Sequence, residues 1–372
     1  MPRIGIDARK LEDGGIGRYV AELLSRVPRL APASSFVALA SPAGRQRLGA
    51  DPRFGASNLA VVEVRSAGYS LGEHVELGRA ARAQRLDLLH VPHYVLPATV
   101  VCPVVVTVHD LIHWRLPRSP LQAAYVRLLL ALVRRRARVV LAPSHAVARD
   151  LVDLAHIDRE RIRVVANGVD AAQWAGEDGP EAGTAFVRRR QLAPPYVLNV
   201  TNGLPHKGLD LLLEAWREMP GVQLVLAGRG SDRPAVRARV DQAGIPDGAV
   251  VVLGELSDAD LRLAYRAAAA VVVASRLEGF GLPALEAMAA GVPVIAAEAG
   301  ALPEVVGDAG VLFPVESVAC LRRALYRFMP GSDLVGRHDM IRRGLARARE
   351  FTWERTAQET FAAYERALRW HT

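Results

Sequence analysis

Short apolar runs alternate with longer stretches of helical spacing along nearly the whole chain. The runs include "RIGID", "SFVALA", "LAVVEV", "DLLHV" and "PVVVTVHD" in the first half, and "YVLNVTN", "VQLVLAG", "AVVVLGE", "AVVVASR" and "VPVIAAE" in the second. They are rich in valine and do not alternate apolar with polar residues, which is typical of strands buried on both faces of a parallel sheet. Repeated strand–helix–strand units of this kind predict an α/β protein with doubly wound parallel sheets.

The pattern also predicts how the chain is divided. It breaks between residues 170 and 195, where Gly, Pro and acidic residues gather as in a linker. A chain of 372 residues is longer than one ordinary core. We therefore predict two Rossmann-like domains, residues 1–182 and 183–352, facing each other across a central cleft. Residues 353–372 form an amphipathic pattern, and we expect this helix to pack back on the N-terminal domain.

The composition narrows the possible partners. The chain is 51% hydrophobic, 23% charged and 6% aromatic, and carries 47 − 39 = +8 charges. A basic balance favours phosphorylated small molecules, anionic lipid or nucleic acid, although a solvated arginine-rich surface also explains it. Because aromatic residues are few and charge runs are short, we expect no nucleic-acid partner. The two cysteines are far apart, and neither a signal region nor an apolar stretch of about 18 residues is present, so we expect a cytoplasmic protein.

The two lysines stand out among the basic residues. Of 47 lysines and arginines, only Lys10 and Lys207 are lysines. Lys207 lies in "TNGLPHKGLD", between a predicted strand and a predicted helix. A compact ammonium can lie between two phosphates as a point charge, where a planar guanidinium is bulkier and differently oriented. Lys207 is therefore a candidate phosphate ligand; the alternative is a lysine retained by chance at the start of a helix.

The most informative segment is "ASRLEGFGLPALEAMAAGVPVIA", residues 274–296. A buried strand is predicted to end at Ser275, and a helix to begin at Pro283, where the missing N–H has no cost. Seven residues separate Glu278 in the loop from Glu286 in the helix. The free N–H groups at the helix start suit phosphate, and carboxylates on either side suit paired hydroxyls. The layout fits a sugar, a diphosphate and a ribose in that order.

The segment "EGFGLPALE", with the "GVPVIA" that follows, resembles the retaining GT-B glycosyltransferases of the group 1 family, whose signature is two glutamates separated by seven residues. The resemblance implies that Glu278 binds the donor sugar and supports charge at the reacting centre, and that Glu286 holds the ribose of the nucleotide. It further implies donor contacts at Gly279, Phe280, Gly281 and Leu282.

"YVLNVTNGLPHKGLDLLLEAW" resembles the strand–loop–helix with which this family grips the donor diphosphate. Lys207 matches the family lysine, and Asn202 stands where many members have an arginine. Arg229, in "LAGRGSD", and His206 are candidates to supply the missing charge. The resemblance thus implies that Asn202, Lys207 and Arg229 lie at the diphosphate.

Two features of the first half complete the candidate site. Gly14 and Gly15 precede a helical pattern, and the resemblance implies that this loop lies over the donor phosphates and shapes the acceptor side. It is not a dinucleotide fingerprint, because Val20 occupies the third glycine position. His109 follows a buried strand, where the family places a histidine near the reacting carbon; the alternative is a histidine bonded to backbone. His93 is a weaker acceptor-side candidate; the alternative is a histidine with a structural role.

The resemblance covers most of the chain and is strongest between residues 196 and 315. It implies a retaining glycosyltransferase with Glu278, His109 and Lys207 as catalytic residues. The donor would be a nucleotide diphosphate sugar, with no other cofactor, and the acceptor a glycan, a lipid-linked glycan or a small molecule of cell-surface polysaccharide synthesis. The segment "TVHDL" resembles mannosyl-transferring members of the family, and this resemblance favours mannose as the donor sugar. The alternatives are a non-catalytic nucleotide-sugar-binding subunit and a GT-B epimerase or phosphorylase.

Two further segments bear on metal binding and on membrane binding. "DAD" at residues 258–260 follows Ser257 at a predicted helix start, so capping explains it better than a metal site, and we expect no metal. Residues 121–138 combine a leucine-rich stretch with arginines, as an interfacial helix does. Peripheral contact with an anionic membrane, at its inner face, and a buried helix with solvated arginines are both open. The arginines concerned are Arg127, Arg134, Arg135, Arg136 and Arg138.

Overall fold

The computed structural model describes residues 1–66, 71–176, 179–219, 221–328 and 334–369. The chain forms two compact units: unit 1 is Met1–Gly168 with Trp353–Thr372, and unit 2 is Val169–Thr352. The division falls after Gly168 rather than after residue 182, and the C-terminal segment belongs to unit 1.

Unit 1 is built on a parallel sheet whose described strands lie in the order β3-β2-β1-β4-β5-β6-β7. The strands are β1 (Arg3–Asp7), β2 (Ser35–Ala40), β3 (Leu59–Glu63), β4 (Leu88–Val91), β5 (Val104–Thr107), β6 (Ala137–Ala142) and β7 (Ile162–Val164). From β3 to β6 this is the Rossmann order, in which the direction of winding reverses between β1 and β4. Every residue of β4 and β5 is buried, as their continuous apolar runs predict.

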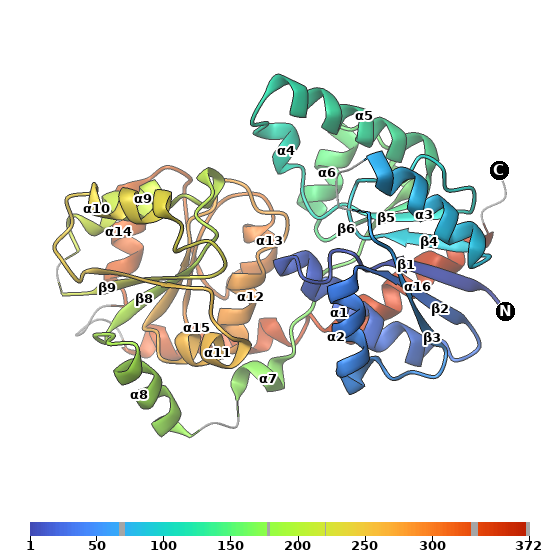
Figure 1. Ribbon diagram of the computed structural model, residues 1–372. Helices are drawn as coiled ribbons and strands as arrows, with labels where there is room; N and C mark the ends of the chain where they lie inside the picture. The colour runs from blue at the N-terminus through green and yellow to red at the C-terminus, as the bar shows by residue number, and fades with distance from the viewer. Residues whose placement is uncertain (67–70, 177–178, 220, 329–333, 370–372) are drawn as a thin grey trace. The chain divides into compact units, whose positions relative to one another are not determined.

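Helices cover both faces of this sheet. They are α1 (Gly14–Leu30), α2 (Pro42–Ala50), α3 (Leu71–Ala83), α4 (Ile112–Arg115), α5 (Pro120–Arg136), α6 (His145–Asp153) and α16 (Trp353–Arg369). Figure 1 shows α3, α5 and α6 on one face, and α1, α2 and α16 on the other. Helix α16 packs beside α1 and against β4, β5 and β6, although more than 300 residues separate α16 from α1 in sequence. It fills a place that the direct connection from β4 to β5 leaves without a helix.

A buried polar chain fixes α16 to the sheet. The His90 ring on β4 lies between two hydroxyls, with Nδ1 2.7 Å from the Tyr364 hydroxyl of α16 and Nε2 2.8 Å from Thr107 Oγ1. The Tyr19 hydroxyl of α1 lies 3.0 Å from the same Thr107 oxygen. Burial lowers the pKa of His90 to about 3, so the ring is neutral and bonded at both nitrogens. These hydrogen bonds fix the position of α16 on the sheet, because a shift of the helix would leave buried polar atoms without partners.

Unit 2 repeats the architecture with described strands in the order β10-β9-β8-β11-β12-β13, all parallel. The strands are β8 (Tyr196–Val200), β9 (Gln223–Ala227), β10 (Val250–Gly254), β11 (Ala270–Val273), β12 (Val294–Ala297) and β13 (Val311–Phe313). This is again the Rossmann order, and here the winding reverses between β8 and β11. The predicted fold class, doubly wound parallel sheets in two Rossmann-like domains, is confirmed.

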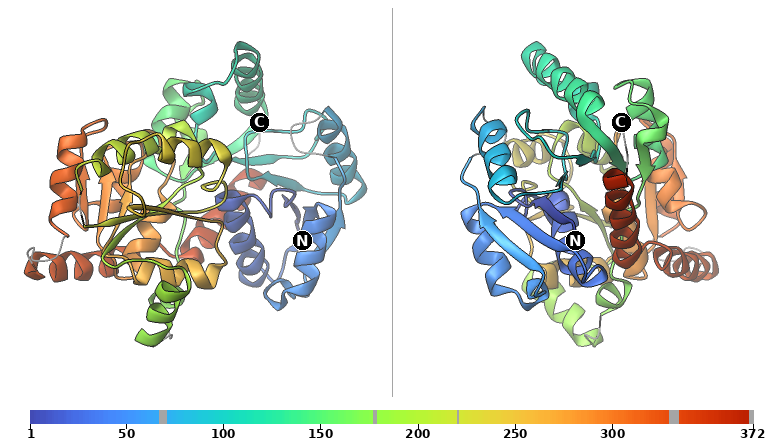
Figure 2. Two further views of the ribbon diagram at one scale, coloured as in Figure 1. Left: turned by 60° about the vertical axis from the view of Figure 1, so that its left-hand side comes forward. Right: turned by 90° about the vertical axis from the view of Figure 1, so that its right-hand side faces the viewer.

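The helices of unit 2 also lie on both faces (Figures 1 and 2). They are α7 (Ala171–Ala175), α8 (Pro180–Arg189), α9 (Leu209–Trp216), α10 (Pro234–Asp241), α11 (Asp258–Arg266), α12 (Leu282–Ala289), α13 (Leu302–Val306), α14 (Val318–Tyr326) and α15 (Leu334–Ala348). Helices α9, α10 and α14 lie on one face, and α11, α12 and α15 on the other. Among the described helices, none combines the length and the hydrophobicity that a membrane span requires.

The segment predicted to be a linker, residues 170–195, is largely helical, as α7 and α8 show, while residues 177–178 lie outside the described part. Pro180 begins α8, and its missing N–H is harmless there, so the Gly-Pro composition marks a helix start rather than an unstructured linker. Helix α8 packs on α11, where Arg190 pairs with Asp260 at 2.8 Å. Ser257 caps α11 by accepting a hydrogen bond from the Asp260 N–H, so the "DAD" segment is a capped helix start, as predicted.

Candidate functional site

Lys207 and Glu278 meet at the switch point of unit 2, the place where the winding of its sheet reverses. Lys207 ends the 3₁₀ turn Pro205–Lys207 after β8, and Glu278 lies in the loop after the neighbouring strand β11. Lys207 Nζ donates to Glu278 Oε2 at 2.8 Å, and the two side chains are 18% and 13% exposed. Ligands of doubly wound sheets bind outside the carboxyl ends of the strands at this reversal. The structure therefore places both residues where the fold expects a ligand.

Backbone contacts hold the two loops together. The Arg276 N–H donates to the His206 carbonyl at 2.7 Å, and the Arg276 guanidinium reaches Asp210 with both of its terminal nitrogens. Gly208 has φ +66°, and a Cβ there would lie 2.1 Å from the Ala274 carbonyl oxygen, so only glycine fits. The distance between Lys207 and Glu278 is thus set by the backbone rather than by the ion pair alone.

Glu278 is held as a carboxylate. Burial alone would raise its pKa, but the charge and hydrogen bond of Lys207, with a hydrogen bond from Ser275, bring the pKa below its usual value. Its backbone is also fixed, because the Ala301 N–H donates to the Glu278 carbonyl at 3.0 Å. Gly300, with φ +54°, lets this contact form, since a Cβ there would lie 2.2 Å from the same oxygen.

Helix α12 begins directly after the loop. Gly281 is its N-cap in the left-handed region, with φ +102°. The helix begins one residue before the predicted Pro283, and β11 ends at Val273 rather than Ser275. Phe280 is buried, with its ring 5.8 Å from that of Phe351, so its side chain belongs to the core.

Glu286 lies one turn into α12 and is more deeply buried than Glu278. Only 4% of it is exposed, and its Oε2 accepts a hydrogen bond from the Tyr265 hydroxyl at 2.9 Å. The edge of the Tyr265 ring in turn contacts Trp174, with 5.1 Å between the ring centroids. Tyr265 therefore fixes one carboxylate oxygen of Glu286.

Asn202 lies in the loop after β8 and Arg229 in the loop after β9, and these two loops pack closely. Asn202 Oδ1 accepts a hydrogen bond from the Leu204 N–H at 3.2 Å and so shapes its own loop. Gly228, with φ +114°, approaches so closely that a Cβ there would lie 2.7 Å from the Thr201 carbonyl oxygen. The loop that carries Arg229 thus lies beside the loop of Asn202, while the other candidate for the missing charge, His206, is buried.

In unit 1, Gly14 and Gly15 are the first residues of α1 and are exposed, with φ +48° at Gly14. His109, after β5, is partly buried and lies edge-on to Tyr19, 4.9 Å between centroids. Its Nε2 donates to the Pro92 carbonyl at 3.1 Å, and burial lowers its pKa to about 4. At neutral pH the ring is therefore uncharged, and Nδ1 is the nitrogen that accepts a hydrogen bond.

His93 is part of a buried charge network after β1. Its Nε2 lies 3.2 Å from Asp7 Oδ2, and its Nδ1 accepts from the Val95 N–H. Asp7 also pairs with Arg9 at 2.8 Å, and Arg9 with Glu73 at 2.9 Å. Burial alone would raise the pKa of Asp7, but hydrogen bonds from His93 and Arg9 hold it well below its usual value. His93 is therefore bonded at both nitrogens within this network, which favours a structural role over acceptor binding.

Two family models match the sequence. "Glycosyl transferases group 1" matches residues 185–346, nearly all of unit 2. "Glycosyltransferase Family 4" matches residues 13–173, nearly all of the first segment of unit 1.

The chain belongs to the group 1 glycosyltransferases.

Curated relatives of this group 1 glycosyltransferase include two kinds of enzyme. The O-antigen chain mannosyltransferase RfbU of Salmonella typhimurium is 28% identical over 188 residues, 50% of this chain and 49% of the relative. The D-inositol 3-phosphate glycosyltransferase of Salinispora tropica is 34% identical over 252 residues, 62% of this chain and 52% of the relative. The chain thus spans about half the length of these relatives.

Solved structures share the fold of this group 1 glycosyltransferase. HepE of Anabaena, in complex with UDP-glucose, superposes with a TM-score of 0.79 at 19% identity and covers 98% of this chain and 100% of its own. WaaG, a glycosyltransferase of lipopolysaccharide biosynthesis, gives a TM-score of 0.73 at 14% identity, covering 97% and 98%. The fold is the GT-B fold.

Several residues of this group 1 glycosyltransferase that shape the site were not predicted. Arg276, Tyr265 and Gly300 act through contacts with residues distant in sequence, and no local pattern marks them. Within the described residues, no cluster of three or more His, Cys, Asp or Glu side chains could hold a metal ion.

Proposed function

We propose that this protein is a retaining glycosyltransferase that moves a hexose from a nucleotide diphosphate sugar to an acceptor hydroxyl. The observation that carries the proposal is the contact between Lys207 and Glu278 at the switch point of unit 2, directly before helix α12 with Glu286. The mannosyltransferases among the relatives support mannose as the sugar. The complexes of HepE with UDP and with UDP-glucose support a nucleoside diphosphate as the carrier.

The donor would lie across the carboxyl ends of β8 and β11. Lys207 would donate to the diphosphate oxygens and stabilise the negative charge that grows as the bond to the sugar breaks, which is often the largest contribution in such reactions. Glu286 would accept hydrogen bonds from the ribose hydroxyls, while the hydrogen bond from the Tyr265 hydroxyl to Oε2 fixes the orientation of the carboxylate. Backbone N–H groups at residues 279–282 would face the sugar and phosphates, and Asn202 and Arg229 would border the diphosphate.

The transfer itself needs no protein nucleophile in this proposal. The anomeric carbon loses its bond to the diphosphate oxygen and gains one to the acceptor oxygen on the same face. The acceptor proton passes to the departing phosphate oxygen, so the atoms balance. Glu278, a carboxylate at neutral pH, would bind the donor sugar and stabilise positive charge at that carbon. His109, neutral with Nδ1 as its acceptor, would bind a sugar hydroxyl rather than supply a proton. We propose that no metal takes part.

The first test is nucleotide binding by the full chain. Thermal stabilisation by UDP, GDP, ADP and dTDP would be compared in the wild type, Lys207→Ala and Arg342→Ala. Arg342 is the matched control, because it removes one positive charge from unit 2 at a side chain that is 76% exposed. We expect one nucleotide to stabilise the wild type and the control, and Lys207→Ala much less. Equal stabilisation of all three proteins would contradict the assignment of Lys207.

A second measurement separates the enzyme from a non-catalytic binding subunit. Slow release of free sugar from the matching nucleotide sugar, without acceptor and in the presence of a chelator, is expected for the wild type. Binding without any release, even when candidate acceptors are added, would favour the binding-subunit alternative. Release that stops only in chelator would contradict the metal-free proposal.

We also propose peripheral contact between α5 and an anionic membrane. Leu121 and Leu128 are 81% and 66% exposed on the outer side of this helix, with the exposed Arg135 further along it. Two other arginines of the segment bond to backbone within unit 1: Arg136 donates to carbonyls at residues 98 and 100, and Arg138 donates to the Ala367 carbonyl at 2.9 Å. More protein should sediment with phosphatidylglycerol vesicles than with phosphatidylcholine vesicles, and less of the double variant Leu121→Glu/Leu128→Glu should sediment with phosphatidylglycerol. Equal sedimentation with both vesicle types would contradict the proposed membrane contact.

A further inference from the structure

Arg276 connects the two loops that carry Lys207 and Glu278. It lies two residues before Glu278 in the loop after β11, and its main-chain N–H donates to the His206 carbonyl at 2.7 Å. Its guanidinium reaches the same turn, because Nη1 donates to the Pro205 carbonyl at 3.0 Å. Pro205 and His206 are the first two residues of the 3₁₀ turn that ends at Lys207. One residue of the Glu278 loop thus binds the backbone of the Lys207 turn at two places.

Two carboxylates fix the plane of the guanidinium. Asp210, in the first turn of α9, accepts from Nη1 at 2.8 Å and from Nη2 at 2.7 Å. Glu316, in the loop after β13, accepts from Nη2 at 2.9 Å and from Nε. The hydrogen bonds from Arg276 hold the pKa of both carboxyl groups below their usual values, so both are charged at neutral pH. Because the guanidinium is planar and rigid, these bonds determine how Nη1 meets the Pro205 carbonyl.

The hydrogen bonds of Arg276 also indicate which role its side chain can have. An arginine side chain has five N–H donors, and here five hydrogen bonds use them: four to the two carboxylates and one to the Pro205 carbonyl. A phosphate could be bound only by breaking one of these bonds. The arrangement therefore favours a side chain that holds other residues in place over one that binds the donor.

Glu316 has a backbone conformation that its contacts must maintain. Its φ is +66°, in the left-handed region that residues other than Gly, Asn and Asp seldom adopt. Residues in this region persist where the surrounding structure holds them. The hydrogen bonds from Arg276 contribute to this, and they connect a third loop to the other two. Arg276 thus joins the loops that follow β8, β11 and β13.

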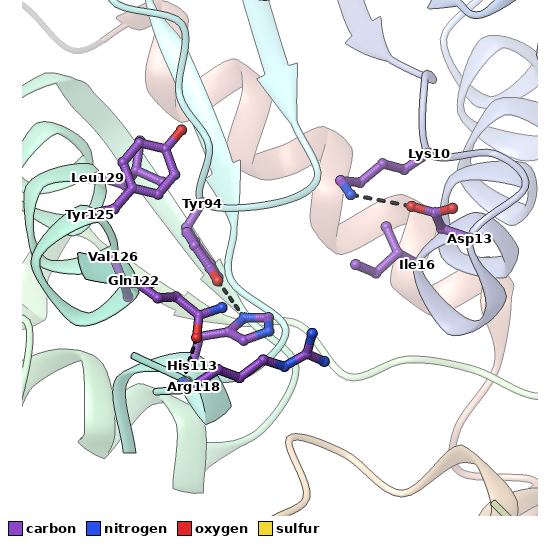
Figure 3. Close-up of a pocket in the computed structure, with 10 residues that line it drawn as sticks. All are labelled: Lys10, Asp13, Ile16, Tyr94, His113, Arg118, Gln122, Tyr125, Val126 and Leu129. Carbon is purple, nitrogen blue, oxygen red and sulfur yellow. Dashed lines mark hydrogen bonds and ion pairs between the residues drawn. The ribbon is translucent and has the colours of Figure 1, made fainter. Parts of the chain in front are cut away.

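The other lysine of the chain forms a pair that needs no such connection. Lys10 lines a cavity of unit 1 and pairs with Asp13, three residues further along, at 3.2 Å (Figure 3). The course of one short segment sets that distance. Lys207 and Glu278 are 71 residues apart in sequence and belong to different loops. Their separation changes whenever one loop moves relative to the other, and the hydrogen bonds of Arg276 oppose such a movement.

The separation matters most while the bond between sugar and phosphate breaks. In the proposed reaction Lys207 faces the departing diphosphate and Glu278 faces the anomeric carbon. Stabilisation of growing charge depends steeply on geometry, and a displacement of about 1 Å can lower a rate about 100-fold. Binding of the nucleotide involves further contacts, including those at Glu286, and depends less on this one distance. Loss of the connection should therefore lower kcat more than it weakens nucleotide binding.

We propose that Arg276 is a positioning residue of the transfer reaction, which sets the separation of Lys207 and Glu278 without touching the donor. The inference rests on the proposed function and adds a residue to it. Lysine cannot take over this role, because an ammonium has three donors and lacks the planar fork that binds Asp210 with two parallel hydrogen bonds.

The kinetic test uses the full chain as wild type, Arg276→Met, Arg276→Lys and Arg322→Met. Arg322 is the matched control, because its side chain is 24% exposed against 27% for Arg276 and its pair with Glu218 involves neither loop. Hydrolysis of UDP-glucose and GDP-mannose without acceptor gives kcat and KM, and calorimetry gives the affinity for UDP and GDP. We expect kcat to fall about 10- to 100-fold in Arg276→Met, with nucleotide affinity changed less than about threefold. Arg276→Lys should recover only part of kcat, and Arg322→Met should match the wild type.

Two further measurements separate positioning from other roles. Hydrogen exchange of a peptide over residues 203–210, without any ligand, should be faster in Arg276→Met and unchanged in Arg322→Met. The triple variant Arg276→Met/Asp210→Asn/Glu316→Gln removes the two carboxylate charges that Arg276→Met leaves without their partner. Because the connection between the loops is still missing, kcat should stay low in this variant.

Four results would overturn the proposal: an unchanged kcat in Arg276→Met, nucleotide affinity that falls as much as kcat, recovery of kcat in the triple variant, or unchanged hydrogen exchange. If Arg276→Met does not fold, Arg276→Lys replaces it, and a kcat equal to that of the wild type would overturn the proposal. A wild type that hydrolyses neither nucleotide sugar would defeat the proposed function instead, and hydrogen exchange would then decide separately whether Arg276 holds the Lys207 turn.

Discussion

Replacing Lys207 with methionine removes the cation from the pair with Glu278 and keeps most of the side-chain volume. Lys207 Nζ and Glu278 Oε2 are 2.8 Å apart, and both side chains are largely buried. Two unit charges about 4 Å apart attract by about 4 kcal/mol at an effective dielectric constant of about 20, before the cost of desolvation. A hydrogen bond to a charged group contributes about 1.5–3 kcal/mol net. Because both side chains keep some contact with water, we expect a coupling energy of about 2 kcal/mol.

This coupling depends on pH in a defined direction. The pKa of Glu278 is lowered in the folded protein, so its contribution to stability is complete above the pKa of an unfolded glutamate. The contribution is lost as pH falls through the lower, folded value. The difference in unfolding free energy between the wild type and Lys207→Met should therefore be full at neutral pH and fade in acid.

The assay is a double-mutant cycle with Lys207→Met, Glu278→Gln and the double variant. A chain with two units need not unfold in one step, so urea unfolding should be read by hydrogen exchange of peptides from β8 and β11. Lys207→Arg is the control that keeps the charge: it should restore most of the stability without restoring nucleotide binding. A coupling energy under about 0.5 kcal/mol, the range of exposed surface pairs, would refute the reasoning.

Two further perturbations test other parts of the structure. Lowering the pH from 7 to 5 should destabilise unit 1 by about 2 kcal/mol for each of His90 and His109. Their pKa values of about 3 and about 4 keep both rings neutral in the folded protein, whereas histidines of the unfolded chain bind protons below a pH of about 6.5. Urea unfolding at both pH values measures this difference, and an unchanged unfolding midpoint would contradict it. Gly300→Ala should displace Glu278 and lower donor hydrolysis at least about tenfold, the effect of about 1.4 kcal/mol, whereas Gly183→Ala, whose Cβ would meet nothing within 4 Å, should not.

The strands could be predicted from the sequence, because strands buried on both faces appear as continuous valine-rich runs. It also placed Glu278 and Lys207 after strands, and a parallel sheet brings strand ends to one edge. It misjudged residues 170–195, because Gly179, Pro180 and Glu181 begin a helix there and their composition is also that of a linker. It could not show that His90 contacts Tyr364, since 274 residues separate them, nor that Lys10 lines a cavity. Such contacts depend on how the sheet and its helices pack, which local spacing does not encode.

The return of α16 to unit 1 has a consequence for synthesis on the ribosome. Unit 2 is one continuous segment and can fold as soon as it emerges, whereas unit 1 lacks α16 until all of unit 2 has been made. That interval is 352 − 168 = 184 residues, or about 10–40 s at 5–20 residues per second. During it, His90 and the strands under α16 lack the helix that covers them, so the nascent chain should recruit holding chaperones at unit 1 until Tyr364 has been translated.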